Sequence, residues 1–477
     1  MISKDFPYKH EFFKIFEEIC RIPHGSGDTA ALARFCVDFA EKNGCKAVID
    51  KVGNVIIKKK AGKGFENAQP IIIQGHLDMV CDKLPESRHD FTRDPLKLKY
   101  DGKYISADGT TLGGDDGIAV AYALALVSDK EAQLPPLEIL LTSDEETGLY
   151  GAMGLDGSML SGKMLINIDS EEEGILLCGC AGGVVAKTTG EFPCGVSTHG
   201  VIKLTLSGCA GGHSGIEINK NRINAALQMA ELIKSGGTDH RLISFVGGGK
   251  NNAIPCNCTV ETIVEQQHQK QFIDNVKAAF ESLKDRSNGT DDAPTLEINV
   301  IEGKLCNCLK AADSRKITEY LCSVPDGVVQ TGETGVVTSL NTGVVMLKNG
   351  KFYSEALIRS MQNGDLDVIG ERVVDTASAQ GLSVEFSDRY PAWEYNAVSP
   401  LREKMVTVFE KMYGKKLQVS TIHAGLECGI ISDKIEGMDA VSFGPDLLDV
   451  HTVNERLDAE SAVRGFEYLK EVLKSLK

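Results

Sequence analysis

The sequence predicts an α/β fold in which a domain with a central mixed sheet is interrupted by an inserted α/β domain. Helix and strand patterns alternate from about residue 8 to 182, which indicates a mixed or parallel sheet covered by helices. A second βα pattern follows from about 184 to 385. The last part is short and mostly helical, so we expect it to return to the first domain. The predicted parts are therefore 1–183, 184–385 and 386–477.

The first part begins with predicted helices at Glu11–Ile19 and Ala30–Asn43 and a predicted strand at Lys46–Lys58. Three apolar runs then read as buried strands, because short runs of β-branched and aliphatic residues are typical of them. These runs are Pro70–Gly75, Leu137–Thr142 and Met164–Ile168.

Glycine marks two further features of the first part. The segment Leu112–Gly117 contains adjacent glycines and precedes an apolar helix predicted at Ile118–Val127. Cys178–Gly183 is also rich in glycine and is the predicted boundary of the inserted domain.

The inserted domain and the last part complete the predicted fold. Their predicted elements are, in order, a strand at Val201–Ser207, helices at Ile223–Lys234 and Gln267–Lys284, a strand at Leu382–Phe386, a helix at Pro400–Tyr413, a strand and turn at Val441–Pro445, and a closing helix at Ala459–Leu476.

Composition excludes several classes of protein. The chain has 477 residues, of which 42% are hydrophobic, as in an ordinary globular protein of two or three domains. Its net charge of −16 argues against nucleic acid and anionic membrane surfaces as partners. No apolar run approaches the roughly 18 residues of a membrane span, and the N-terminus lacks the apolar segment of a signal peptide. We therefore expect a cytoplasmic protein.

The 14 cysteines have two interpretations. Without a secretion signal they are expected to be reduced thiols. Three Cys-x-Cys pairs occur, formed by Cys178 and Cys180, Cys256 and Cys258, and Cys306 and Cys308. A thiolate metal site or a redox centre is one interpretation of these pairs. We favour buried or incidental thiols, because the common zinc spacing is Cys-x-x-Cys.

Chemically active side chains follow each of the three predicted strands. His76 and Asp78 follow the first, Glu145 and Glu146 lie in the acidic segment after the second, and Asp169 follows the third. The carboxyl ends of strands in open α/β sheets are where ligands collect. Imidazole and carboxylate together suit zinc, manganese or cobalt, and several carboxylates suggest a bridged pair of ions.

Two further positions complete this set. Asp115 and Asp116 lie at the glycine-rich start of the apolar helix. His451 follows the strand and turn at Val441–Pro445, and it would supply the nitrogen ligand that the other positions lack. A solvated acidic loop or a surface histidine explains any one of these positions alone, but not all of them together.

The order of these residues along the chain resembles the order of the metal-site residues in the M20 metallopeptidases. The surrounding motifs are similar to those of the branch of aminoacyl-histidine dipeptidases (peptidase D, or cytosolic non-specific dipeptidase). They cover most of the chain, although about 265–345 shows little to match. The motifs are Gly75–Val80, Asp144–Glu146, Leu165–Glu171, Gly212–Gly215, Asn252–Pro255 and His423–Gly429.

The resemblance implies a zinc-peptidase-like catalytic domain and an inserted lid and dimerisation domain, and it gives roles to the metal-site residues. Asp115 would bridge two divalent ions, with His76 and Asp169 completing one site and Glu146 and His451 the other. Asp78 would orient His76. Three carboxylates leave a pair of divalent ions with net positive charge, so a bridging hydroxide is expected, with Glu145 as general base. A plain acidic loop is the alternative for Glu145.

One position departs from the pattern. The residue after the bridging aspartate is often Asn in this branch, and here it is Asp116. Either acid could therefore bridge, and we assign Asp115 because its position in the motif matches.

The resemblance also implies substrate-binding residues in the inserted domain. His213 would stabilise the oxyanion of the tetrahedral intermediate. Arg359, in the segment Ala356–Ser360 that reads as the end of a strand, could clamp the terminal carboxylate of a substrate, and Asn252 could assist it. A surface salt bridge is the alternative for Arg359.

Together these features predict a dipeptidase of broad specificity with two divalent ions, zinc first and manganese or cobalt as alternatives. Homodimerisation through the lid domain is expected from the resemblance alone. The rival functions are another M20 amidohydrolase (an N-acyl amino acid amidase or a tripeptidase), a non-catalytic metal-binding protein, and a thiol-based redox protein.

Overall fold

The computed structural model describes residues 2, 6–197, 200–287, 290, 292–302, 305–333 and 335–477. The chain forms two compact units. The first contains Met1–Cys180, Tyr395–Thr421 and Leu426–Lys477, and the second contains Ala181–Glu394 and Ile422–Gly425. The first boundary between the units lies within the glycine-rich run 178–183. The second boundary lies after residue 394, whereas the sequence predicted it after residue 385. The short return of Ile422–Gly425 to the second unit was not predicted.

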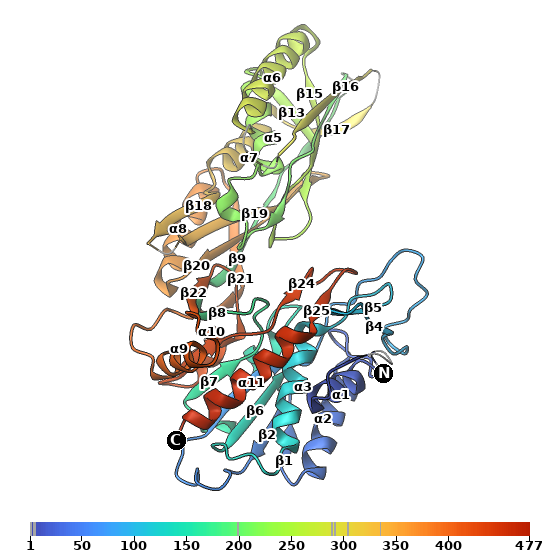
Figure 1. Cartoon of the computed structure of the whole chain (residues 1–477). Coiled ribbons are helices and arrows are strands. Elements are labelled where there is room, and N and C mark those ends of the chain that lie inside the picture. Colours follow the sequence, from blue (N-terminus) through green and yellow to red (C-terminus); the bar gives the residue numbers. More distant parts are fainter. Residues whose placement is uncertain are drawn as a thin grey trace. The chain divides into compact units, whose positions relative to one another are not determined.

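The first unit is built on an eight-stranded mixed sheet (Figure 1), in the order β1-β2-β6-β3-β7-β23-β8-β22. The four central strands β6, β3, β7 and β23 are parallel, β1 and β2 are antiparallel to their neighbours, and β8 is antiparallel to β23. The strands are β1 Lys46–Ile49, β2 Val55–Lys59, β3 Ile71–His76, β6 Leu137–Thr142, β7 Met164–Asn167, β8 Ile175–Cys180, β22 Gln418–Ile422 and β23 Asp439–Ser442. A smaller sheet contains β4 Leu98–Tyr100, β5 Tyr104–Ala107, β24 Leu447–Leu448 and β25 Arg456–Asp458.

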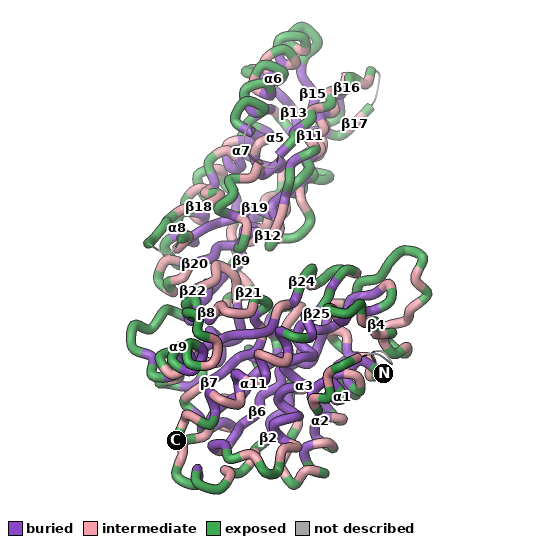
Figure 2. The backbone as a smooth tube through the Cα atoms, in the orientation of Figure 1, coloured by how far each residue is buried: buried purple, intermediate pink, exposed green. Residues whose placement is uncertain are grey.

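Helices cover this sheet, and the most buried of them, α3, packs against the last helix of the chain, α11. They are α1 Glu11–Ile19, α2 Ala30–Lys42, α3 Gly114–Ser128, α4 Tyr150–Gly154, α9 Pro400–Tyr413, α10 Glu427–Lys434 and α11 Ala459–Ser475. Every residue of α3 from Gly114 to Val127 is buried (Figure 2). On α3, the Tyr122 ring lies 5.2 Å from that of Phe466 on α11, and its hydroxyl donates to the Ala462 carbonyl. The C-terminal part therefore completes the core of the N-terminal part, because its helix covers the most buried helix of the unit.

The second unit contains a nine-stranded sheet in the order β16-β11-β15-β13-β19-β20-β9-β21, with β18 paired to β19. Its strands are β9 Gly182–Glu191, β11 Val201–Ser207, β13 His240–Gly248, β15 Cys258–Val264, β16 Thr295–Ile301, β18 Gly327–Gly332, β19 Gly335–Lys348, β20 Lys351–Ser360 and β21 Ser383–Tyr390. Two short ribbons accompany it, β10 Cys194–Ser197 with β17 Cys306–Leu309, and β12 Gly212–His213 with β14 Ala253–Ile254. The helices are α5 Ala225–Ser235, α6 Gln266–Ser287, α7 Ala311–Ser323 and α8 Asn363–Ser378.

The predicted α/β class is confirmed, and most predicted elements are present within a few residues of their predicted bounds. The exception is the strand predicted at 46–58, which is the hairpin of β1 and β2. The Asp50 carboxylate accepts the N–H groups of Val52 and Asn54, both at 2.9 Å, and Gly53 has φ +94. The turn therefore interrupts an apolar pattern that continues on both of its sides.

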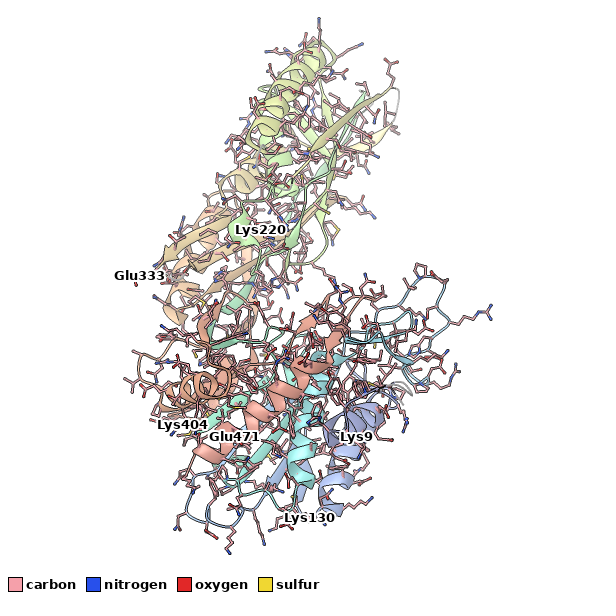
Figure 3. All side chains as sticks on the ribbon, in the orientation of Figure 1. Lys9, Lys130, Lys220, Glu333, Lys404 and Glu471 are labelled. Carbon is pink, nitrogen blue, oxygen red and sulfur yellow. The ribbon has the colours of Figure 1, made fainter. Side chains whose placement is uncertain are left out.

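Charged side chains lie mainly at the surface, as the exposed Lys9 and Lys130 illustrate (Figure 3). Among the described residues, no helix combines the length and apolar character that crossing a membrane requires.

Candidate active site

Neighbouring parallel strands bring the predicted residues of the first unit together. β3 ends at His76, and it lies between β6, which leads to Glu145 and Glu146, and β7, which leads to Asp169. Because parallel strands end at the same edge of a sheet, these side chains share one edge. The start of α3 adds Asp115, and the loop after β24 adds His451.

Asp115 lies between two imidazoles. Its Oδ1 is 3.0 Å from His76 Nε2, and its Oδ2 is 3.1 Å from His451 Nε2. On the first side, His76 Nε2 is also 3.6 Å from Asp169 Oδ1. On the second side, His451 Nε2 is 3.0 Å from Glu146 Oε2. The contacts thus form two contact sets, each made of residue types that bind metal ions, and the two sets share the carboxylate of Asp115.

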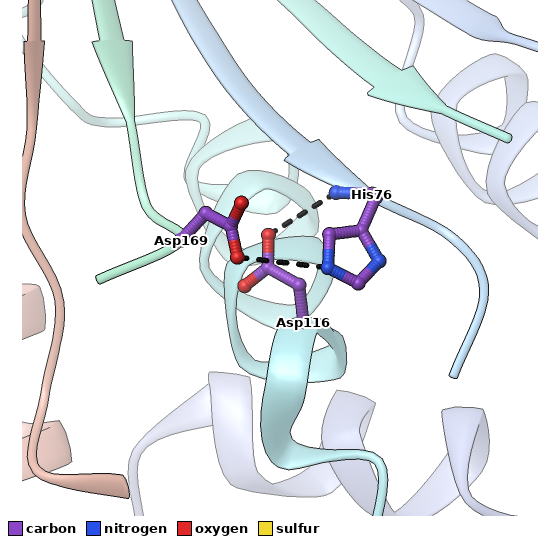
Figure 4. Close-up of side chains that lie close together, drawn as sticks. All are labelled: His76, Asp116 and Asp169. Atoms are coloured by element: carbon purple, nitrogen blue, oxygen red, sulfur yellow. Dashed lines mark hydrogen bonds and ion pairs between the residues drawn. The ribbon is translucent and has the colours of Figure 1, made fainter. Parts of the chain in front are cut away.

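Asp116, the neighbour of Asp115, faces the backbone. Its Oδ2 accepts the backbone N–H of His76 at 3.1 Å (Figure 4). A Cβ atom on Gly75 would lie 2.5 Å from this oxygen, so only glycine lets the helix start approach β3 so closely. Burial raises the pKa of Asp116 well above its ordinary value. Its side chain can also group with His76 and Asp169 as ligands, but one of its oxygens is already engaged by the backbone N–H of His76.

Asp78 connects His76 to the segment that carries Glu145. His76 Nδ1 lies 3.0 Å from the Asp78 carbonyl oxygen and 3.5 Å from its carboxylate, so the carbonyl is the nearer acceptor. The carboxylate accepts the backbone N–H groups of Glu145 at 2.9 Å and Glu146 at 3.3 Å. It also accepts the hydroxyl of Ser26 at 2.8 Å, a partner that the sequence did not reveal. Asp78 therefore holds both the imidazole and the acidic segment in place.

Glu145 lies close to the candidate metal ligands, but its carboxylate forms no hydrogen bond or ion pair with them among the described residues. Within the described part of the chain, no hydrogen bond or ion pair engages its carboxylate, which groups with His76 and Glu146 within 4.8 Å. Burial raises the pKa of Glu145 well above its ordinary value, and the nearby charges of Asp169 and Glu146 add to this. A carboxylate in this state can accept and release a proton.

The site has an excess of negative charge. Burial alone would lower the pKa of His76, but hydrogen bonds to Asp115, Asp169 and Asp78 raise it well above the ordinary value. Hydrogen bonds to Asp115 and Glu146 raise the pKa of His451 to about 11. Positive charge is therefore strongly favoured at both imidazoles. Because histidine and carboxylate are ligands of divalent metal ions, this set of residues fits a metal centre.

Two buried glutamates near the site make contacts that the sequence did not predict. Glu455 accepts backbone N–H groups at the start of α3. Glu427 is fully buried and accepts hydrogen bonds from the side chains of Gln74, at 2.5 Å, and Thr142, at 2.6 Å. Burial raises the pKa of Glu427 to about 7. Glu427 lies within the motif His423–Gly429, but the motif gave it no role, because residue type does not distinguish a buried acid from a surface acid.

The other three predicted residues belong to the second unit. His213 and Asn252 lie together, because His213 pairs with Ala253 and the backbone N–H of Ser214 donates to the Asn252 carbonyl at 2.9 Å. His213 Nδ1 accepts the backbone N–H groups of Gly215 and Ile216, at 3.2 and 3.1 Å. A ring nitrogen that accepts leaves the proton on the other nitrogen, so Nε2 of His213 is a donor.

Arg359 is buried at the end of β20, with 5% of its surface exposed. Its Nη1 donates to the Tyr390 hydroxyl at 2.8 Å, but its Nε has no hydrogen-bond partner among the described residues. Ser339, opposite Arg359 in the sheet, bonds His423 Nε2 at 2.7 Å. Burial, and then the charges of Arg359 and His213, lower the pKa of His423 to about 4. A buried cation with an unused donor favours an anionic partner.

The Cys-x-Cys pairs are largely buried. Cys178, Cys180, Cys258 and Cys308 are buried, whereas Cys306 is partly exposed and Cys256 is exposed. Burial raises the pKa of Cys178 to about 12 and also raises that of Cys308. This disfavours the thiolate that redox chemistry and metal binding require.

Comparison with known proteins identifies relatives of the whole chain. The profile of peptidase family M20/M25/M40 matches residues 72–475. A cytosol non-specific dipeptidase of Escherichia coli is 36% identical over 473 residues, which cover 97% of this chain and 96% of the relative. The crystal structure of an aminoacylhistidine dipeptidase from Vibrio alginolyticus has a TM-score of 0.87 and 33% identity, covering 100% of this chain and 98% of that one. A tripeptidase structure from Staphylococcus aureus, with a TM-score of 0.57, 15% identity and 98% of each chain covered, shares the fold alone.

Proposed function

The chain belongs to peptidase family M20/M25/M40, and on that premise we propose that it is a metal-dependent hydrolase that cleaves dipeptides. The observation that carries this proposal is the position of Asp115, each of whose oxygens faces a different imidazole. A carboxylate placed in this way can bridge two ions, and the rest of each contact set supplies further ligands.

Two divalent ions would be held by these sets, one by His76 and Asp169 and the other by Glu146 and His451, with Asp115 shared. Zinc is the first choice because it is commonly bound by histidine and carboxylate, and manganese and cobalt are the alternatives. Such a pair would polarise the carbonyl of the peptide bond and lower the pKa of water from near 16 to about 7.

Glu145 would act as the general base. It would take the proton of the attacking water at its carboxylate and later deliver it to the nitrogen of the leaving amine. Support comes from its raised pKa and from the lack of a hydrogen bond to its carboxylate among the described residues. Asp78 would keep this segment in position through the backbone N–H groups of Glu145 and Glu146.

We propose the second unit as a lid that supplies substrate-binding residues. His213 would donate from Nε2 to the oxyanion that develops on the carbonyl oxygen. Arg359 would bind the terminal carboxylate of the dipeptide, with Asn252 assisting. Support for the clamp is the buried guanidinium whose Nε lacks a partner in the described structure. A clamp of this kind favours dipeptides, because a longer peptide places its terminal charge elsewhere.

The experiment that tests this function compares a dipeptide with its C-terminal amide. We expect wild type to cleave the dipeptide about 10- to 100-fold faster, in kcat/KM, because hydrogen bonds to charged groups contribute about 1.5–3 kcal/mol. Arg359→Lys should remove most of this difference by weakening cleavage of the dipeptide only, since lysine lacks the planar pair of donors. Equal rates of wild type on both substrates would contradict the carboxylate clamp and the dipeptide preference that depends on it.

We further propose that the protein is cytoplasmic and pairs with a second copy of itself. A cytoplasmic location is supported by the relative from E. coli, whose name describes a cytosol enzyme. Pairing of two copies through the second unit rests on the family resemblance, and light scattering of the purified protein measures whether two copies pair.

A further inference from the structure

We infer that Glu455 is a positioning residue, which ties the segment that carries Asp115 to the loop that carries His451. The inference deepens the proposed function, because it explains how the shared carboxylate and one imidazole keep their relative placement. Glu455 itself would touch neither substrate nor ion.

The carboxylate of Glu455 accepts four successive backbone N–H groups. Oε2 accepts those of Leu112 at 2.7 Å and Gly113 at 3.0 Å. Oε1 accepts those of Gly114 at 2.7 Å and Asp115 at 3.3 Å. The residue is only 3% exposed, so water does not substitute for these bonds. One side chain therefore satisfies the backbone of the whole segment that leads into Asp115.

The start of α3 needs such an acceptor. Asp115 and Asp116 have φ and ψ outside the helical region, so the buried N–H groups that precede the regular part of α3 need acceptors from elsewhere in the chain. Gly113, at the N-cap position, has no side chain to accept them, and its φ of +66 lies in the left-handed region. Glu455 supplies a carboxylate from the opposite end of the chain. A carboxylate is suited to this because both of its oxygens only accept.

Glycine at position 114 permits the close approach. A Cβ atom there would lie 2.7 Å from Leu447 Cδ2 and 3.3 Å from Glu455 Oε1. The adjacent glycines of the sequence thus have a structural reason, since they open the backbone to a carboxylate that arrives from another loop.

The His451 loop requires an anchor of its own. His451 has φ +62 and Asp449 has φ +53, conformations that residues other than glycine adopt only when their surroundings hold them there. The loop is closed by the backbone N–H of Glu455, which donates to the Thr452 carbonyl at 3.1 Å. Glu455 thus fixes the loop with its backbone and the Asp115 segment with its side chain.

Glu455→Gln tests the inference, because glutamine keeps the shape but replaces one acceptor by a donor. That donor would face two backbone N–H groups. We expect the metal-free variant to fold and to bind Zn²⁺ about 10- to 100-fold more weakly, the usual effect of losing a partner that orients metal ligands. Zn²⁺ affinity is measured by titration in competition with a chromophoric chelator. With Zn²⁺ in excess, kcat for a dipeptide should fall while KM changes little.

Glu138→Gln is the matched control. Glu138, at the start of β6, is also 3% exposed. Its Oε2 accepts the backbone N–H groups of Ser161 at 2.8 Å and Gly162 at 2.9 Å. It lies at the end of this strand opposite to the site, so its variant should lose thermal stability but keep the Zn²⁺ affinity of wild type. If Glu455→Gln does not fold, Glu455→Asp keeps the charge on a shorter side chain and should give an intermediate affinity.

The outcomes separate this inference from the function on which it rests. Equal Zn²⁺ affinity of wild type and either Glu455 variant would overturn the positioning role and leave the dipeptidase proposal intact. If wild type itself bound no Zn²⁺ and cleaved no dipeptide, the proposed function and the inference would both be wrong.

Discussion

Replacing Glu145 by Gln is expected to lower kcat for dipeptide hydrolysis by about 10²- to 10⁴-fold, the usual contribution of a general acid or base. Glutamine cannot accept the proton of the attacking water, so the chemical step loses its base. The metal content should stay at that of wild type, because the two contact sets that share Asp115 are formed by His76 and Asp169 and by His451 and Glu146, without Glu145. Metal analysis and steady-state kinetics on the same preparation measure both quantities.

The neighbouring residue provides a control with the same chemical change. Glu146 lies 3.0 Å from His451 Nε2, so Glu146→Gln removes a proposed ligand. This variant should lose metal content as well as activity, whereas Glu145→Gln should lose activity alone. The assignment of the base would be wrong if Glu145→Gln lost its ions, or if it retained the activity of wild type.

Asp115→Asn is expected to disturb both proposed metal sites at once. Each oxygen of Asp115 faces one imidazole, and the amide nitrogen of asparagine cannot act as a ligand in place of the second oxygen. We expect the affinity for Zn²⁺ to fall by more than about 100-fold, beyond the usual effect of losing an outer partner of a metal ligand, with loss of measurable hydrolysis. Metal titration of the metal-free protein gives the affinity.

Asp116→Asn is the matched variant on the next residue. Burial raises the pKa of Asp116 well above its ordinary value, which favours the protonated form that asparagine resembles in shape and charge. Its oxygen accepts a backbone N–H of His76, which the amide oxygen of asparagine can also do. This variant should therefore keep its ions and most of its activity. The opposite pattern, with Asp116→Asn inactive and Asp115→Asn active, would transfer the bridge to Asp116.

The strand ends were the part of the site that sequence could predict. An apolar run identifies a strand, and the order of His76, Glu146 and Asp169 after such runs identifies residues that a parallel sheet brings to one edge. Ser26 and Glu455 escaped prediction for a physical reason. Each acts through a hydrogen bond to a group that is distant in sequence. Ser26 donates to the Asp78 carboxylate, and Glu455 accepts backbone N–H groups, which leave no trace in the residue type.

Local geometry limited the prediction in two other places. The strand predicted at 46–58 is a hairpin, because the capacity of Asp50 to accept two backbone N–H groups outweighs the apolar pattern on either side. The resemblance implied that Asp78 orients His76, and in the structure its carbonyl is nearer to the ring than its carboxylate. Residue type cannot indicate which oxygen of an aspartate faces a neighbouring ring.

The most direct test of the central claim is hydrolysis of a dipeptide by the purified chain before and after removal of its metal. We expect the protein to lose activity on treatment with a chelator and to recover it on addition of about two equivalents of Zn²⁺, Mn²⁺ or Co²⁺. We also expect faster cleavage of the dipeptide than of a tripeptide or an N-acetyl amino acid. A metal-loaded protein that cleaved the N-acetyl amino acid or the tripeptide, but left dipeptides intact, would contradict the proposed function.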